Sequence, residues 1–364
     1  MAKKIKPLIF GVAGTTLSEQ EIKLFKKYES VGFILFSRNI ETRNQTIALT
    51  KSLKALYPDR KIPIFVDQEG GRVARIKPPI AQKLYPTAEH FSTLYDENKN
   101  KARHELKNNY IELMSELKSL GIDSPCAPVC DLHYKHANAI IGDRSFGNNA
   151  NKIIDLCKEA ISGIHHADGL PFIKHIPGHG RAKVDSHFEL PIIDEPLASL
   201  ENTDFKIFKE LANAKVWAMT AHIIYSAIDP SLPATISPDV ISYIRNKIGF
   251  KGTLVSDDLC MYALHGKIGK KNAILKRVIN MAQKEQDWKK NYAQSLQNLF
   301  NMDTHDIGNA LIVEMCENKL LEIKPEFLES LTKITKMTLR AGCDIILHCS
   351  GDIEEMRAVC SVFK

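Results

Sequence analysis

Short apolar runs that alternate with helix-like segments are the feature that most restricts how this 364-residue sequence can fold. Each run is continuously apolar, which is typical of strands buried on both faces, and the helical connections between them favour parallel pairing. Eight strands are predicted: the start of the chain, MAKKIKPLIFGVAG, and residues 31–36, 62–66, 122–129, 170–173, 216–220, 252–255 and 344–347.

Eight strands that alternate with helices predict an α/β fold, namely a (β/α)8 barrel of the TIM type. Polar residues follow many of the predicted strands, and a barrel assembles its active site at the carboxyl ends of its strands. An open doubly wound sheet is the alternative, but no GxGxxG turn follows the first strand. The sequence therefore favours one catalytic domain over residues 1–364.

Residues 270–330 do not fit this alternation, because they are helical in pattern, charged and much longer than one barrel helix. Apolar residues at helical spacing, such as Leu275, Val278 and Ile279, predict two or three amphipathic helices. We interpret the segment as a helical insertion after strand 7, with packing as its expected role and no partner identified. A role in gating is the alternative, because the insertion starts on the active-site face.

Composition and charge exclude several classes of partner. The formal charge of +6 is spread over the chain without a basic block and interleaved aromatics, so we expect no nucleic acid. No segment is long and apolar enough to span a membrane. The eight cysteines form no CxxC pair and mostly lie in apolar segments, as is typical of reduced thiols in a cytoplasmic protein.

The segment KHIPGHGRAKVDSH carries several proton-handling side chains. Lys174 and His175 come at the carboxyl end of the strand 170–173, and a proline and two glycines then impose a loop. Asp185 and His187 are separated by one residue, so extended backbone places both side chains on one side. A neighbouring carboxylate raises the pKa of an imidazole, which suits proton transfer near neutral pH.

Two other interpretations of this loop stay open. Aspartate and histidine beside glycine and proline often only tie a loop together by hydrogen bonds. Zinc binding by His175, His179, Asp185 and His187 would make the protein a zinc hydrolase, since imidazole and carboxylate are common zinc ligands, but the spacing matches no compact zinc motif. We therefore predict no metal and no cofactor.

KHIPGHGRAKVDSH resembles the signature of the family 3 glycoside hydrolases, specifically the bacterial β-N-acetylhexosaminidases that act on peptidoglycan fragments. The resemblance covers Leu8 to about Leu264 and resumes near Leu331 to Gly351. It implies that the partner is a small glycan or muropeptide containing N-acetylglucosamine, and that the protein needs no cofactor.

Two aspartates, Asp257 and Asp258, follow the strand 252–255. Cleavage of a glycosidic bond needs a carboxylate near the anomeric carbon and a proton donor near the leaving oxygen. Neighbours on a strand point to opposite sides, so only one aspartate is expected to face the site, and parity does not decide which. The resemblance implies that Asp257 is the nucleophile and that Asp185 with His187 is the acid/base.

The resemblance also implies a set of sugar-binding residues at successive strand ends, where cations and a carboxylate can orient hydroxyls by charge-assisted hydrogen bonds. For His222, taken singly, a core histidine is the simpler interpretation. The candidates are Asp67 and Arg75 in VDQEGGRVARI, Arg144 in IIGDRSFG, the pair Lys174 and His175, and His222.

The leading hypothesis is thus a cytoplasmic retaining exo-β-N-acetylglucosaminidase that acts on peptidoglycan-derived muropeptides. A histidine base is neutral after it has donated its proton, so it repels an incoming anion less than a carboxylate would. A phosphorylase at the same site is therefore an alternative. A catalytically silent sugar-binding protein is another, although the joint presence of Asp257, Asp185 and His187 argues against it.

Overall fold

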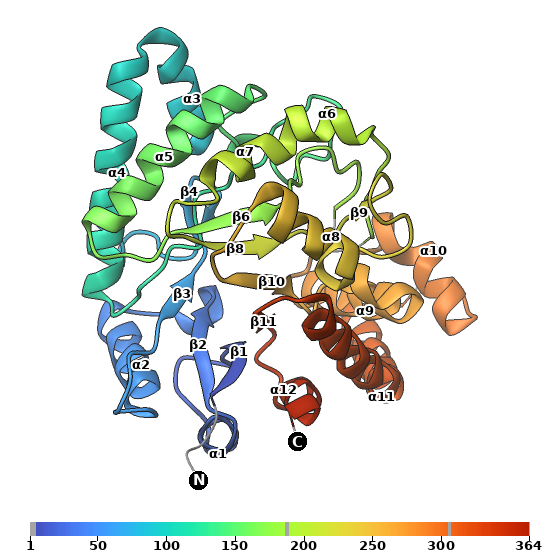
Figure 1. Ribbon diagram of the computed structural model, residues 1–364. Coiled ribbons are helices and arrows are strands. Elements are labelled where there is room, and N and C mark those ends of the chain that lie inside the picture. Colours follow the sequence, from blue (N-terminus) through green and yellow to red (C-terminus); the bar gives the residue numbers. More distant parts are fainter. Residues whose placement is uncertain (1–4, 186–188, 305–306, 364) are drawn as a thin grey trace.

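The computed structural model describes residues 5–185, 189–304 and 307–363, and its centre is a sheet of seven parallel strands (Figure 1). The strand order across the sheet is β3-β2-β1-β11-β10-β8-β6, so the chain ends pair at its middle through β1 and β11. The strands are β1 (Lys6–Gly11), β2 (Ser30–Leu35), β3 (Ile64–Val66), β6 (Phe172–Ile176), β8 (Trp217–Thr220), β10 (Leu254–Asp258) and β11 (Ile345–His348).

Both faces of these strands are buried, as the continuous apolar runs predicted. Leu8 and Phe10 belong to the large core between the sheet and its helices, whereas Ile9 belongs to a second apolar cluster within the curl of the sheet. In that inner cluster Phe65 and Phe172 meet edge to face, with ring centroids 5.8 Å apart. The inner cluster fills the curl of the sheet and reaches the carboxyl ends of the strands, where Leu347 and Cys349 belong to it.

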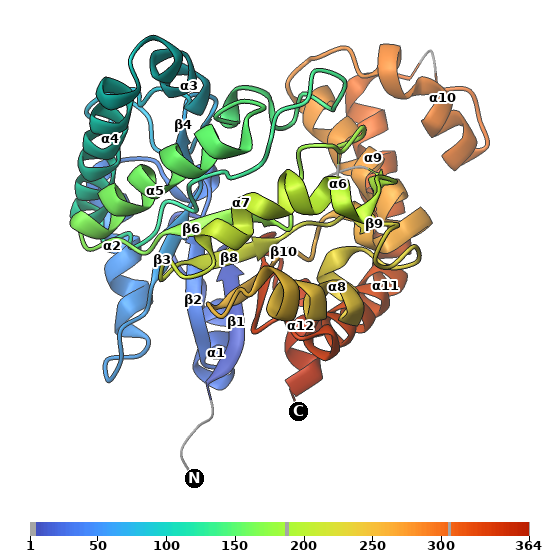
Figure 2. The same ribbon diagram turned by 45° about the horizontal axis from the view of Figure 1, so that its top comes forward.

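Helices cover the outer face of the sheet (Figures 1 and 2). The first begins at a capping box, in which the Ser18 hydroxyl and the Glu21 carboxylate satisfy each other's backbone N–H groups. The covering helices are α1 (Glu19–Lys27), α2 (Arg43–Ala55), α3 (Ala88–Glu97), α4 (Lys99–Ser119), α5 (Ala150–His166), α6 (Leu197–Asn202), α7 (Asp204–Leu211), α8 (Pro238–Tyr243) and α12 (Ile353–Cys360).

The predicted (β/α)8 barrel is wrong, because the regular sheet is open: over the described residues its edge strands β3 and β6 do not pair with each other. The missing strand is the one predicted at 122–129, which forms only isolated bridges, at Ser124 with β3 and at Val129 with β6. Pro125 and Pro128 have no N–H to donate to a ladder, and Cys126 has a φ of 47°. The fold is a curled, open α/β sheet.

Three helices stand between β10 and β11 at one side of the molecule: α9 (Gly266–Gln283), α10 (Lys289–Phe300) and α11 (Asn309–Ala341) (Figures 1 and 2). Residues 266–327 have an apolar cluster of their own, which includes Leu275, Trp288, Ile312 and Phe327, and we call them the lobe. The last turns of α11 instead join the main core. One catalytic domain over 1–364 with an insertion at 270–330 stays a prediction.

No helix of the described chain is long and apolar enough to span a membrane.

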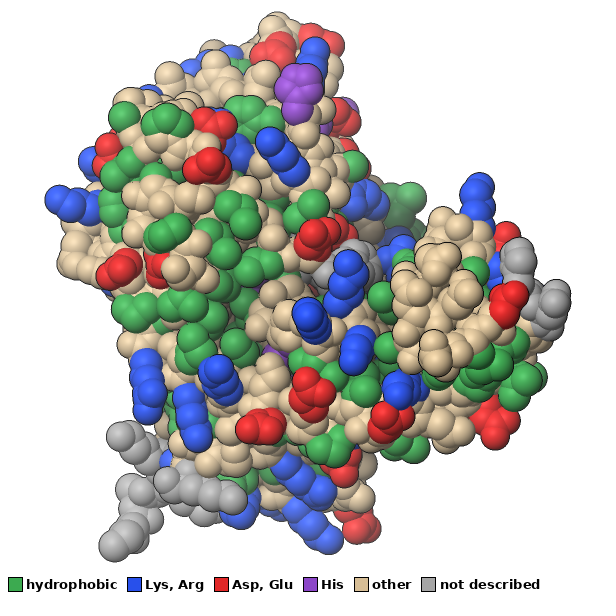
Figure 3. Space-filling view, turned by 90° about the vertical axis from the view of Figure 1, so that its right-hand side faces the viewer, with side chains coloured by type: hydrophobic (Ala, Val, Ile, Leu, Met, Phe, Trp, Pro, Cys, Tyr) green, Lys and Arg blue, Asp and Glu red, His purple; other side chains and the backbone are tan. Residues whose placement is uncertain are grey.

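The lobe carries exposed basic side chains on one of its helices, α9. Figure 3 shows several Lys and Arg side chains across the middle of the face that the lobe occupies. Helix α9 contributes to this charge because it has no acidic residue and its cations are exposed: Lys267, Lys270, Lys271, Lys276 and Arg277.

Candidate active site

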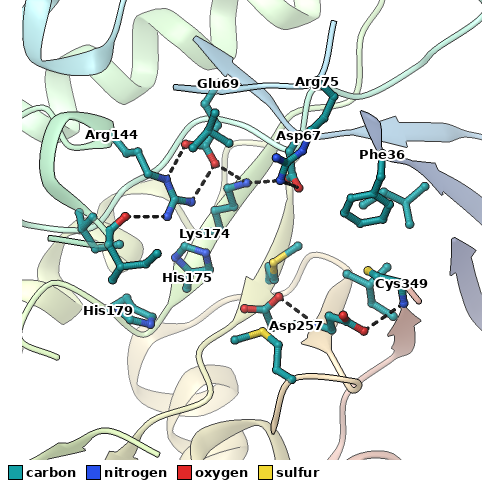
Figure 4. A pocket seen from close by; sticks show the side chains of 18 of the residues that line it. Phe36, Asp67, Glu69, Arg75, Arg144, Lys174, His175, His179, Asp257 and Cys349 are labelled. Carbon is teal, nitrogen blue, oxygen red and sulfur yellow. Dashed lines mark hydrogen bonds and ion pairs between the residues drawn. The ribbon is translucent and has the colours of Figure 1, made fainter. Parts of the chain in front are cut away.

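A cavity of about 230 Å³ opens at the carboxyl ends of the strands (Figure 4). It is lined by six of the nine residues that the sequence analysis proposed for the site, and they come from separate parts of the chain. These six are Asp67, Arg75, Arg144, Lys174, His175 and Asp257.

A short hairpin brings a further carboxylate and two arginines to the cavity. Strands β4 (Gln68–Gly70) and β5 (Val73–Ala74) pair antiparallel, directly after β3. The turn between them needs Gly70 and Gly71, whose φ values are 109° and 56°, and a Cβ on Gly70 would lie 2.1 Å from the Pro86 carbonyl oxygen. Glu69 therefore lies at the cavity beside Asp67.

Buried ion pairs join the cavity-lining residues into a network (Figure 4). Lys174 Nζ lies 2.9 Å from Asp67 Oδ1 and 2.7 Å from Glu69 Oε1. Arg144 donates to both oxygens of Glu69, at 2.7 and 2.8 Å. Arg75 donates to Asp67 Oδ2 at 3.2 Å. Each carboxylate is thus held by two cations.

The network keeps its members charged. Burial by itself would raise the pKa of Glu69, but Arg144 and Lys174 outweigh it and lower that pKa to about 2. Burial would likewise raise the pKa of Asp67, which Lys174 and Arg75 hold well below its ordinary value. Fixed charges of this kind can orient the hydroxyls of a sugar by strong hydrogen bonds.

Asp131 fixes the position of His175. This fully buried carboxylate accepts a hydrogen bond from His175 Nδ1 at 2.7 Å and another from the backbone N–H of His179 at 2.7 Å. Burial would raise the pKa of Asp131, yet His175 lowers it, so the carboxylate is an acceptor and Nδ1 carries the imidazole proton. Burial and then His175 lower the pKa of His179 to about 4, so the His179 ring is neutral at pH 7.

The two aspartates at the end of β10 differ in their partners, although both line the cavity. Asp258 Oδ1 accepts from the backbone N–H groups of Cys260 and Cys349, each at 3.0 Å. Asp257 Oδ1 accepts from the N–H of Asp258 at 2.8 Å. The expectation that only one could face the site is wrong, because the pairing of β10 with β11 shifts register between Val255 and Asp258.

Of the remaining three predicted residues, two are described by the structure, and neither lines the cavity. His222 is fully buried, with Nδ1 2.7 Å from Thr235 Oγ1 and Nε2 3.0 Å from the Asp258 carbonyl oxygen, so it supports the end of β10 instead of lining the cavity. Asp185 is partly buried and outside the cavity lining; its carbonyl oxygen accepts from the N–H of Glu189. His187 lies outside the described residues.

Sequence reasoning missed Glu69 and Asp131. Glu69 follows Asp67 by two residues at the end of the same predicted strand, so its position in VDQEGG was the available indication. Asp131 follows the segment 122–129 in the same way. Their partners are far away in sequence, since Asp131 is 44 residues from His175 and Glu69 is 75 residues from Arg144.

The chain is similar in sequence to a known family and to proteins with assigned names. The model of the glycosyl hydrolase family 3 N terminal domain matches residues 1–299. A β-hexosaminidase of Alkalilimnicola ehrlichii is 38% identical over 261 residues, which are 71% of this chain and 73% of the relative. One of Nitrosomonas eutropha is 34% identical over 258 residues, with 71% and 73% covered.

A solved structure, NagZ from Neisseria gonorrhoeae in complex with N-trifluoroacetyl-D-glucosamine, superposes with a TM-score of 0.74. It is 26% identical, and the superposition covers 98% of this chain and 85% of that chain.

Proposed function

The chain belongs to glycosyl hydrolase family 3, and on that premise we propose that it is a retaining exo-β-N-acetylglucosaminidase that releases N-acetylglucosamine from peptidoglycan-derived muropeptides. It is a glycoside hydrolase of the β-N-acetylhexosaminidase type, like the relatives named β-hexosaminidase. The observation that carries the finer proposal is that Asp257 shares one cavity with the network of Asp67, Glu69, Lys174 and Arg144.

In the proposed mechanism Asp257 attacks the anomeric carbon while Asp185 and His187 protonate the leaving oxygen. The carbon–oxygen bond to the aglycone breaks, and a covalent glycosyl-enzyme forms on the Asp257 carboxylate. The same pair then takes a proton from water, which attacks the anomeric carbon and releases the sugar with its configuration retained. The rigid end of β10 supports Asp257, and the loop supplies the proton.

The cavity suits an uncharged sugar ring. Its lining has four cationic side chains, Arg72, Arg75, Arg144 and Lys174, and four carboxylates, Asp67, Glu69, Asp257 and Asp258, so the opposite charges balance. Asp67 can accept hydrogen bonds from sugar hydroxyls, and the cations can donate to sugar oxygens. His175 can accept through Nε2, because its Nδ1 donates to Asp131. We do not extend a sugar-contacting role to His222, because the Asp258 backbone and Thr235 occupy its ring nitrogens.

The natural substrate and the location are part of the same proposal. The muropeptide rests on the resemblance of the loop sequence. A cytoplasmic location is supported by eight free cysteines, of which all but Cys260 are buried, as is usual where thiols stay reduced.

The test is hydrolysis of an aryl β-N-acetylglucosaminide by the wild type, Asp257→Ala and Asp258→Asn, with and without phosphate. We expect the wild type to release the β-anomer first, as NMR can detect, and Asp257→Ala to lose turnover while Asp258→Asn keeps part of it. Azide should rescue Asp257→Ala and give the α-glycosyl azide. A first product with α configuration would refute retention.

The same assay separates the alternatives. Sugar 1-phosphate that forms only with phosphate would identify a phosphorylase. Binding of N-acetylglucosamine without any turnover by the wild type would identify a silent sugar-binding protein.

A further inference from the structure

We propose that Cys260, His348 and Glu355 form a zinc-binding site on the opposite side of the sheet end from the catalytic cavity. One possible ligand atom from each residue lies within 4.8 Å of the others. The three residues come from different elements: Cys260 follows β10, His348 ends β11 and Glu355 lies in α12. The site shares no residue with the loop histidines for which the sequence analysis considered zinc.

The side chain of His348 points away from the sugar site. Its neighbours in β11, Leu347 and Cys349, belong to the inner apolar cluster and line the cavity. Side chains alternate along a strand, so His348 faces outward, where its ring meets Phe10 edge to face at 5.9 Å. A metal bound there would lie behind the catalytic residues.

Two of the three spacings between the ligand atoms fit a tetrahedral ion. Glu355 Oε2 lies 3.4 Å from His348 Nε2 and 3.4 Å from Cys260 Sγ. Zinc bonds of about 2.0 Å to nitrogen or oxygen and about 2.3 Å to sulfur, at tetrahedral angles, place such atoms roughly 3.3 and 3.5 Å apart. The third pair, His348 and Cys260, lies within 4.8 Å and would have to close around the ion.

His348 lacks the hydrogen bonds that a buried imidazole normally makes. The residue is fully buried, and neither ring nitrogen has a hydrogen-bond partner among the residues that the structure describes, although Glu355 is within ion-pair distance. Buried polar side-chain atoms almost always have a partner, so an exception of this kind calls for an explanation. A metal bound to Nε2 supplies one, and imidazole with thiolate selects zinc over magnesium or calcium.

Charge and access are compatible with the ion. A thiolate and a carboxylate together balance the two charges of Zn²⁺, and Glu355 still offers its other oxygen, Oε1, to Lys276 Nζ at 3.5 Å. Glu355, Lys276 and Asp352 line a cavity of about 290 Å³ beside the lobe. Of the three proposed ligands, Glu355 is the one that lines this cavity, so the site lies next to it.

The ion would hold the end of β10 in place. The Cys260 N–H and the Cys349 N–H both donate to Asp258 Oδ1, and Cys349 directly follows His348. A metal that joins Cys260 to His348 thus clamps the two N–H groups that fix Asp258, the neighbour of Asp257. Its role is structural, and Glu355 extends the clamp to α12.

The experiment is to measure zinc content and to titrate Co²⁺ into the full-length protein after chelator treatment. We expect about one ion per chain, with the absorption band of a thiolate-to-cobalt charge transfer. Cys260→Ser should remove the band, and His348→Gln and Glu355→Gln should weaken binding by more than about 10-fold, which is the lower end of the loss found for outer-shell partners. Cys360→Ser is the control, because Cys360 lies in the same helix as Glu355 but is not a proposed ligand; it should keep both the absorption band and the affinity for the ion.

Melting temperature provides a second measurement that does not depend on catalysis. Zinc should raise it for the wild type and Cys360→Ser but not for Cys260→Ser, whose fold circular dichroism would verify. Absence of a stoichiometric ion in the wild type would overturn the proposal. So would a cobalt band that survives Cys260→Ser, or an ion lost from His179→Gln but retained by Cys260→Ser, which would place it in the catalytic cavity.

Discussion

Glu69→Gln is the sharpest test of the buried ion-pair network, because it removes one charge and keeps the shape. The side chain of Glu69 is only 6% exposed and accepts from Arg144 and Lys174 at 2.7 to 2.8 Å. Lowering its pKa from 4.5 to about 2 corresponds to roughly 3 kcal/mol of folding stability, at 1.36 kcal/mol per pKa unit. We therefore expect Glu69→Gln to lower the free energy of unfolding by about this amount. This agrees with the 3–5 kcal/mol typically lost when one partner of a buried pair is removed.

Glu159→Gln is a matched control, because Glu159 also accepts two hydrogen bonds from one arginine, Arg103, at 2.9 and 2.6 Å. That pair is more exposed, at 44% for the arginine and 18% for the glutamate, so we expect a loss below about 1 kcal/mol. Urea unfolding followed by tryptophan fluorescence measures both variants at pH 7. Equal losses for the two would refute the argument that burial makes the Glu69 pairs strong.

The pH dependence gives an independent check with a definite sign. The pKa of Glu69 is lower in the folded than in the unfolded state, so its stabilisation is complete above about pH 4.5 and is lost as the pH falls towards 2. The stability gap between the wild type and Glu69→Gln should therefore narrow between pH 5 and about pH 3. A gap that stays constant over this range would contradict the assigned pKa.

Other substitutions test the remaining parts of the molecule. His187→Ala should slow cleavage of a natural glycan by about 10²- to 10⁴-fold, and cleavage of an activated aryl glycoside by less. Equal losses on the two substrates would show that His187 does not protonate the leaving group. Asp131→Asn should lower kcat/KM by about 10² through misplacement of His175, and unchanged kinetics would rule this out. Phe327→Ala should cost about 3–5 kcal/mol in urea unfolding, whereas Leu321→Ala, 66% exposed, should cost under about 0.5; similar costs would show that the lobe lacks a packed core.

Seven of the eight predicted strands are present because each is an apolar run long enough to be buried on both faces. The segment 122–129 contains Asp123 and Ser124 and fails as a strand, since Pro125 and Pro128 have no N–H to donate to a neighbouring strand. Proline was thus the local feature that distinguishes an open sheet from the closed barrel. Strands β4 and β5, the two short elements that follow β3, have no comparable apolar pattern and could not be predicted.

The candidate site was predictable where position along the chain was enough. Asp67, Lys174 and Asp257 come directly after or at the end of a strand, and parallel strands bring such residues to one edge. Which neighbours also reach the cavity depends on strand register, which sequence parity does not reveal. The register shift in β10 brings Asp258 to the cavity together with Asp257, against the expectation that only one of them would face it. The ring of His222 contacts the Asp258 carbonyl oxygen instead of the cavity.

The lobe leaves the sheet after β10 and returns at β11, and these two strands pair directly, with Val255 opposite Ile345. Because the strands are parallel, the intervening chain runs from the carboxyl end of β10 to the amino end of β11, and the sheet fixes these two points whatever the length of the connection. Closing a longer loop costs only about 0.6 kcal/mol for each doubling, and the lobe supplies an apolar core of its own. Evolution can therefore lengthen, replace or remove the lobe within this crossover while the sugar-facing strand ends remain unchanged, provided that a crossover still joins the two parallel strands.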